Sequence, residues 1–80
     1  MDIPLAFGVT LRKIRNQRKI SQEAFGAELG LHRTHVSLLE RGKRDPLLST
    51  VYQISRRMGI SLPELMTLVD DEIKSQSKET

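Results

Sequence analysis

Cationic and hydrogen-bonding side chains are concentrated in one short stretch of the chain, residues 33–44. The stretch combines arginine and lysine with hydroxyl and imidazole groups, at Arg33, Thr34, His35, Ser37, Arg41, Lys43 and Arg44. Guanidinium groups pair with phosphates and with the edge of guanine, and hydroxyl groups bond to either target. No nucleophile–base pair, carboxylate dyad or phosphate-cradling glycine loop accompanies these residues. The sequence therefore predicts a binding protein and not an enzyme.

The residue types that other kinds of site require are missing from the chain. Cysteine is absent, which excludes a disulfide framework and a thiolate metal site. His32 and His35 have no carboxylate at the spacing of a zinc site, so we expect no metal and no other cofactor. No apolar run approaches the roughly 18 residues of a membrane span, and the first residues lack the basic start of a signal peptide. We therefore expect a cytoplasmic protein with no membrane partner and no small-molecule ligand.

The net charge of +3 is unevenly distributed along the 80 residues. Residues 1–60 carry eleven Lys and Arg against five Asp and Glu, a net charge of +6, whereas residues 61–80 carry −3. A basic body with an acidic end is typical of a protein that meets a polyanion on one side. A surface charged only for solubility would give the same totals, so charge alone does not separate the two interpretations.

Apolar residues recur at helical spacing, and no alternating apolar–polar run predicts a strand. We therefore expect an all-α fold in which one compact five-helix domain, residues 1–74, precedes a polar tail, residues 75–80. Glycine, proline and capping residues mark the boundaries, which places the helices over residues 4–18, 21–30, 33–41, 48–58 and 61–73. In the fourth helix, the side chains expected to face the core are Leu48, Val51, Ile54 and Met58.

The second and third helices form the most informative pattern in the chain. A tight turn at Gly30 joins two short helices, and Gly26 leaves room for one helix to approach the other closely. The apolar residues that would fix the angle between them are Phe25, Leu29, Leu31, Val36 and Leu39. This combination is typical of a helix-turn-helix unit. An ordinary helical hairpin would explain the apolar positions, but not the short, basic and polar outer face of the third helix.

The same stretch resembles the lambda-repressor-like (XRE) helix-turn-helix family. The matching residues are Gln22-Glu23, Gly26, Gly30, the run from Arg33 to Gly42, and Pro46. The likeness extends over about residues 7–66, and the Arg-Thr-x-Val-Ser-x-Leu-Glu-Arg-Gly run is similar to that of the small controller proteins of restriction–modification systems. The resemblance implies a transcriptional regulator that binds double-stranded DNA with residues 33–41 in the major groove.

The resemblance also implies roles for individual residues. The base-contacting positions are Arg33, Thr34, Ser37 and Leu38. The phosphate-contacting positions are Ser21, Gln22, His32, His35, Arg41, Lys43 and Arg44. Arg15 and Glu40 match an arginine and a glutamate that form a structural ion pair in the family, which would fix how the third helix projects.

Several of these residues have an alternative role. Arg33 could contact a phosphate or remain solvated, Leu38 could pack against the fourth helix, and His35 could be solvated. Ser21 is also a suitable N-cap, a role compatible with a phosphate contact. His32 departs from the family, which prefers Asp, Ser or Thr as the cap of the recognition helix.

One unit of this kind reads few bases, so specific regulators usually pair on two half-sites about one helical turn, ~34–36 Å, apart. The apolar stripe of the fifth helix exceeds what one small core needs, so we expect a homodimer through Leu65, Leu68, Val69 and Ile73. Such a dimer would bind a palindromic operator, including one at its own gene. A monomer with an internal stripe is the alternative. Alternative functions are an antitoxin that binds DNA and a toxin, and a protein-interaction adaptor, which would predict a neutral third helix.

Overall fold

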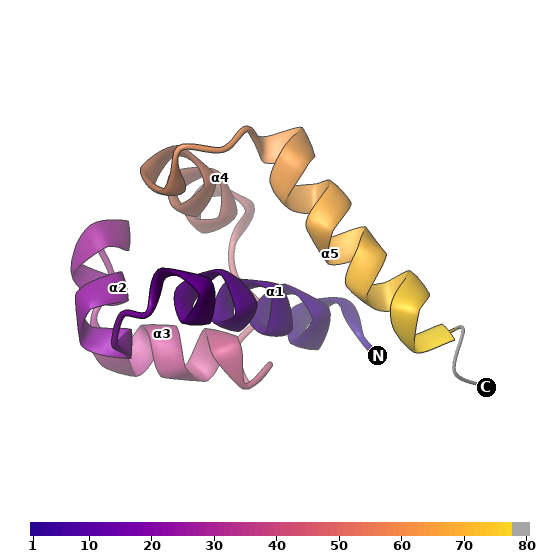
Figure 1. Ribbon diagram of the computed structural model, residues 1–80, viewed down its shortest axis with the longest axis horizontal. Coiled ribbons are helices and arrows are strands. Elements are labelled where there is room, and N and C mark those ends of the chain that lie inside the picture. Colours follow the sequence, from indigo (N-terminus) through magenta and orange to yellow (C-terminus); the bar gives the residue numbers. More distant parts are fainter. Residues whose placement is uncertain (78–80) are drawn as a thin grey trace.

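The computed structural model describes residues 1–77, and the elements found there are all helices, which confirms the predicted all-α fold. In chain order they are α1 (Ile3–Arg18), α2 (Gln22–Leu29), α3 (Arg33–Glu40), α4 (Leu48–Met58) and α5 (Leu62–Ser77). In Figure 1, α1 lies between α3 below it and α5 above it, and it packs against both. The α2 helix packs against α3 and α4, and α4 packs against α5. The helix-turn-helix pair therefore lies on the opposite side of α1 from α5.

Local hydrogen bonds explain where most helices begin. Asp2 Oδ1 accepts from the backbone N–H of Leu5 at 2.8 Å, and Ser61 Oγ accepts from the N–H of Glu64 at 3.1 Å. Each satisfies one of the N–H groups that a helix start leaves unpaired. The α4 helix is the exception, because its N-cap is Leu47, which offers no side-chain acceptor. At this position the sequence carries an exposed leucine in place of a capping residue.

The α5 helix continues to Ser77, beyond the end predicted at residue 73. The sequence there contains no glycine or proline to stop it, and Lys74 Nζ lies 3.1 Å from Asp70 Oδ2, one turn earlier. The hydrogen bond that Lys74 donates to Asp70, helped by the attraction between the charges, raises the pKa of Lys74. Part of the predicted tail is thus helical, and its residues 78–80 lie outside the described residues. No helix within residues 1–77 is long and apolar enough to span a membrane.

A single apolar core joins all five helices. It contains Ala6, Phe7, Leu11, Phe25, Leu29, Val36, Leu39, Val51, Ile54, Met58, Leu65 and Val69. Leu65 and Val69, predicted as dimer contacts, are 0% and 4% exposed, so they belong to the core and leave little surface for a partner. The α5 helix uses these residues to close the core over α1 and α4. Leu48 was expected in the core but is 75% exposed, because it lies in the first turn of α4, at the edge of the core.

Two glycines allow the helices around the helix-turn-helix to approach closely. A Cβ on Gly26 of α2 would lie 2.5 Å from the backbone oxygen of Leu31 in the turn before α3, and 3.4 Å from Cγ2 of Val36 in α3 itself. A Cβ on Gly8 of α1 would lie 2.1 Å from the backbone oxygen of Leu39 in α3. In each case the closest contact is with a backbone atom, so any side chain would force the helices apart. The position of α3 therefore depends on a missing side chain in each of its two neighbours.

Candidate nucleic-acid interface

The α2–α3 unit presents α3 on the surface of the domain. The α2 helix ends at Gly30, whose left-handed backbone (φ 74°) reverses the chain direction. The backbone N–H of Leu31 donates to the oxygen of Gly26 at 2.8 Å, which keeps the turn tight. Val36 and Leu39 face the core, so the opposite side of α3 is left toward solvent. The same end of α2 is held to α4, because Gln53 Nε2 donates to the backbone oxygen of Leu29 at 2.9 Å.

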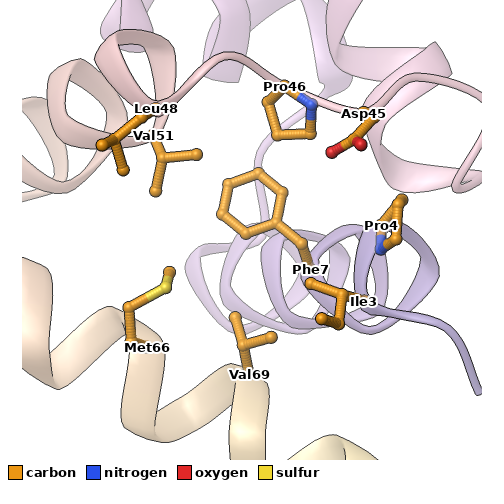
Figure 2. Close-up of a pocket in the computed structure, with 9 residues that line it drawn as sticks. All are labelled: Ile3, Pro4, Phe7, Asp45, Pro46, Leu48, Val51, Met66 and Val69. Carbon is orange, nitrogen blue, oxygen red and sulfur yellow. The ribbon is translucent and has the colours of Figure 1, made fainter.

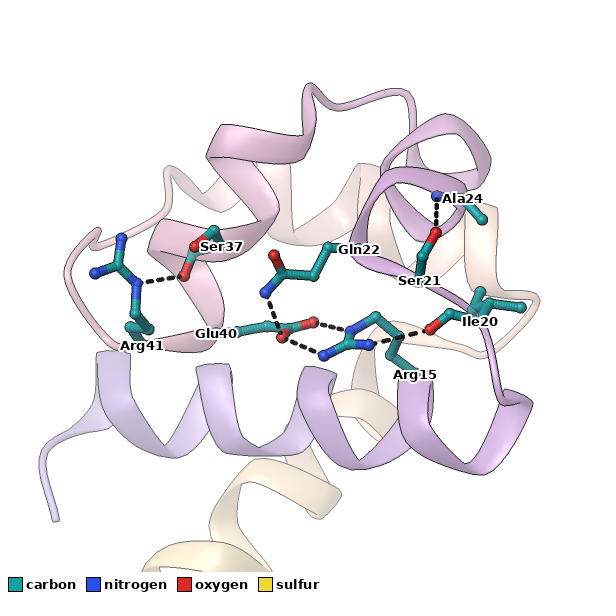
Figure 3. Close-up of polar contacts among 8 residues, drawn as sticks. All are labelled: Arg15, Ile20, Ser21, Gln22, Ala24, Ser37, Glu40 and Arg41. Carbon is teal, nitrogen blue, oxygen red and sulfur yellow. Dashed lines mark hydrogen bonds and ion pairs between the residues drawn. The ribbon is translucent and has the colours of Figure 1, made fainter.

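A buried polar network fixes the C-terminal end of α3 (Figure 3). Arg15 of α1 donates from Nε to Glu40 Oε2 at 2.7 Å and from Nη2 to Glu40 Oε1 at 3.0 Å. Its Nη1 donates to the backbone oxygen of Ile20 at 3.0 Å. Gln22, the first residue of α2, donates from Nε2 to Glu40 Oε1 at 3.1 Å. One carboxylate thus joins α1, α2 and α3.

The burial of this network makes it energetically significant. The side chains of Arg15 and Glu40 are 15% and 2% exposed, so water hardly reaches the carboxylate. The hydrogen bonds to Glu40 raise the pKa of Arg15, with the attraction of the carboxylate adding to them and burial opposing them. The guanidinium therefore stays charged at every pH at which a protein is studied. The pair acts as a permanent brace for α3.

The exposed side of α3 carries the residues expected to read bases. Arg33 and Thr34 are exposed at its N-terminal end, and Ser37 is partly exposed one turn later. Leu38 is half-buried. The main packing partners of α3 are α1 and α2, and not α4. This arrangement disfavours the alternative in which Leu38 packs against the fourth helix.

Cations on α3 and in the following loop lack carboxylate partners. Elsewhere, Lys13 pairs with Glu72 and Arg18 pairs with Glu28. Within residues 1–77, no carboxylate oxygen lies within 4.0 Å of the charged groups of Arg33, Arg41, Lys43 and Arg44. Arg41 Nε instead donates to the backbone oxygen of Ser37 at 3.3 Å, which lays its side chain along α3 (Figure 3). All four cations are exposed, so their charged groups are available to a partner outside the domain.

The remaining predicted phosphate contacts lie around the same surface. Ser21 Oγ caps α2 by accepting from the N–H of Ala24 at 3.0 Å. His35 lies in a shallow hollow with Arg44 and Leu47 at the edge of α3. His32 is the N-cap of α3, and its Nδ1 accepts from the N–H of Thr34 at 3.0 Å. The imidazole therefore performs the capping that sequence considerations assigned to Asp, Ser or Thr.

Sequence reasoning missed an apolar surface beside these residues. A groove of about 200 Å³ is lined by Ile3, Pro4, Phe7, Asp45, Pro46, Leu48, Val51, Met66 and Val69 (Figure 2). Large exposed apolar side chains lie in and around it, namely Ile3, Leu47, Leu48, Tyr52 and Met66, which we call the apolar patch. The signal in the sequence that could have revealed this surface is Leu47, an apolar residue at the N-cap of α4. Two α5 residues predicted as dimer contacts lie elsewhere: Leu68 lines a crevice between α1 and α5, and Ile73 packs against the core.

Comparison with known proteins places this arrangement among regulators. A family model described as helix-turn-helix matches residues 11–65. The control protein C.MunI of a Mycoplasma species is 40% identical over 72 residues, which cover 89% of this chain and 97% of that protein. The control protein C.BamHI of Bacillus amyloliquefaciens is 38% identical over 66 residues, which cover 81% of this chain and 82% of that protein.

A solved structure gives the same result for the fold. The restriction–modification controller protein C.AhdI from Aeromonas hydrophila superposes with a TM-score of 0.70 at 32% identity. The superposition covers 78% of this chain and 94% of that one. The likeness to this controller protein in both sequence and fold thus extends over most of the length of the two chains.

Proposed function

Because the chain belongs to the lambda-repressor-like (XRE-type) helix-turn-helix family, we propose that it is a sequence-specific regulator that binds double-stranded DNA through α3. The observation that carries the proposal is the group of unpaired cations on a braced helix. Within residues 1–77, Arg33, Arg41, Lys43 and Arg44 form no ion pair, whereas the single glutamate of α3 is buried against Arg15. A rigid helix with cations that no ion pair engages is suited to the major groove.

The exposed face of α3 is assigned to base recognition. Arg33 would pair bidentately with O6 and N7 of guanine, a contact worth about 1–3 kcal/mol of discrimination. Thr34 would offer its hydroxyl or methyl group to a neighbouring base. Ser37 is small enough to admit the edge of a base pair closely. Leu38, half-buried and without α4 as a major packing neighbour, would contact the methyl group of thymine.

The rim of this face is assigned to the sugar–phosphate strands. Contacts would come from Ser21 and Gln22 at the start of α2, from His35 and Arg41 on α3, and from Lys43 and Arg44 in the loop. Gln22 already donates one hydrogen bond to Glu40, and its second amide hydrogen is available to a phosphate. Such contacts position the protein and carry no sequence information of their own.

We assign the apolar patch to a second copy of the chain. The patch adjoins the proposed DNA face, because Asp45 and Pro46 line both the apolar groove and the hollow that contains His35. A two-fold axis that passes through the patch and runs in the direction in which α3 faces solvent would place both α3 helices on one side of the dimer, as adjacent half-sites require. The uncapped start of α4 supports the assignment, since Leu47 offers no cap and exposes 72% of its surface.

The dimer is tested by sedimentation equilibrium with two aspartate variants of matched chemistry. Leu48→Asp in the apolar patch is expected to give a monomer. Leu68→Asp, a partly exposed leucine of α5 outside the patch, is expected to leave the dimer intact. The opposite pattern would contradict the patch as the dimer surface.

The likeness to C.MunI, C.BamHI and C.AhdI supports a regulator of the restriction–modification controller type. We infer that it acts at palindromic operators, one of which lies at its own gene. Fluorescence anisotropy with a labelled duplex from upstream of the gene, against a scrambled duplex of equal length, tests this at two salt concentrations. Specific regulators prefer their site by about 10³-fold or more. Equal binding to both duplexes would reject autoregulation. No binding at low salt would reject DNA binding and favour an adaptor.

A further inference from the structure

The N-terminal end of α3 is capped by an imidazole. His32 Nδ1 accepts the N–H of Thr34 at 3.0 Å, and the backbone of His32 has the extended conformation (φ −69°, ψ 149°) typical of an N-cap. An accepting nitrogen carries no proton. In the neutral ring the proton must therefore lie on the other nitrogen, Nε2. The cap thus selects one tautomer of the imidazole.

The second nitrogen of this ring is available to a partner outside the domain. His32 is exposed, and within residues 1–77 its Nε2 has no hydrogen-bond partner. The ring lines a shallow notch between α2 and α3, together with Glu23 of α2 and Arg33 of α3. Within residues 1–77, neither Glu23 nor Arg33 forms an ion pair, and neither side chain is hydrogen-bonded to the ring. The free N–H lies beside the two exposed residues, Arg33 and Thr34, assigned to base recognition.

We propose that His32 is a positioning residue whose Nδ1 caps α3 and whose Nε2–H is thereby fixed as a donor to a DNA phosphate. The proposal rests on the proposed function, because it needs DNA on this face. Aspartate would supply the cap alone, and serine or threonine would place a single hydroxyl donor close to the backbone, short of the position of Nε2. A histidine joins the start of the recognition helix and the phosphate strand through one rigid ring, so the contact sets the position of Arg33 relative to the bases.

Three variants separate the roles of the two ring nitrogens of His32. His32→Ser keeps a cap acceptor, but its hydroxyl is bonded directly to Cβ, so its one donor hydrogen lies at the backbone and does not extend to the position of the imidazole Nε2–H. His32→Ala removes both, and Ser61→Ala removes the cap of α5, away from the proposed interface. Loss of either cap is expected to lower the thermal midpoint by roughly 4–8 °C. His32→Ser keeps a cap, so it is expected to keep the stability that His32→Ala loses.

DNA binding is then measured at pH 8 with the duplex from upstream of the gene. His32→Ser and His32→Ala are both expected to weaken binding by roughly tenfold, the scale of a hydrogen bond to a charged group, while Ser61→Ala binds as the unmodified protein does. If His32→Ser binds as tightly as the unmodified protein, the histidine is a cap only and the proposal is overturned. Failure of the unmodified protein to bind any duplex would instead reject the proposed function.

The tautomer provides a test that needs no DNA. Long-range ¹H–¹⁵N correlation spectra identify which ring nitrogen carries the proton. The proposal requires the proton on Nε2 of His32 at pH 8. A proton on Nδ1 would overturn it, because that nitrogen could not accept from Thr34.

Discussion

Removal of Arg15 is expected to destabilise the protein more than removal of its partner Glu40. Arg15→Ala deletes two of the three hydrogen bonds to the Glu40 carboxylate, which is 2% exposed, and leaves Gln22 as its one partner within residues 1–77. Breaking a buried pair in this way costs about 3–5 kcal/mol, and the upper part of that range applies here. Glu40→Ala leaves an arginine that is 15% exposed and still bonded to Ile20, so about 3 kcal/mol is expected.

The double variant distinguishes a coupled pair from two independent residues. Once Arg15 has been removed, removal of Glu40 relieves an isolated buried charge, so the double variant should lose no more than Arg15→Ala alone. Urea unfolding followed by circular dichroism, at one protein concentration, gives the coupling energy from the four variants. A domain of this size has a free energy of unfolding of about 4–12 kcal/mol, so each loss is measurable. Strictly additive losses, or a smaller loss for Arg15→Ala, would refute the reasoning.

Other consequences follow from single contacts. Gly8→Ala places a Cβ against a backbone oxygen of α3 and should lower the free energy of unfolding by about 3 kcal/mol or more. Gly59→Ala has open space around the new Cβ, so it should lose only the ~1–2 kcal/mol that a left-handed backbone costs. Urea unfolding measures both losses. In anisotropy titrations, Lys43→Ala should reduce the slope of log K for DNA binding against log salt concentration by about 1. Lys13 is paired with a glutamate of α5, so Lys13→Ala should leave this slope unchanged. Leu47→Ser should supply the missing cap of α4 and stabilise the monomer by about 1 kcal/mol, and it should also weaken the dimer. If the monomeric form of this variant is no more stable than the unmodified monomer, the start of α4 does not lack a cap.

Helix starts and the helix-turn-helix were predictable because their signals are local. Ser21 and Ser61 supply acceptors within three residues of the N–H groups that they cap, and Gly30 adopts the left-handed conformation where the sequence predicted a stop. The end of α5 was not predictable in this way. No residue after Ile73 is incompatible with a helix, and polarity alone does not end one.

Apart from Gly26, the features that depend on how helices meet were not visible in the sequence. Gly8 has no local signal that distinguishes it from any other glycine, because its role depends on an oxygen of α3 far along the chain. Apolar counting placed Leu65 and Val69 at a dimer surface, whereas they fill the core. The same counting placed Leu48 inside, although the first turn of α4 extends past the core edge. Periodicity shows which face of a helix is apolar, and not how much of that face the core covers.

The most direct test of α3 as the reading helix is a single-base scan of the bound duplex, with the unmodified protein and with Arg33→Ala. Each base pair of a half-site is substituted in turn, and affinity is measured by anisotropy at constant salt. We expect the unmodified protein to lose about 1–3 kcal/mol at one guanine, and Arg33→Ala to bind all four bases there almost equally while other positions keep their preference. Weakening of Arg33→Ala by the same factor on every duplex would make Arg33 a phosphate contact and contradict base reading through this residue.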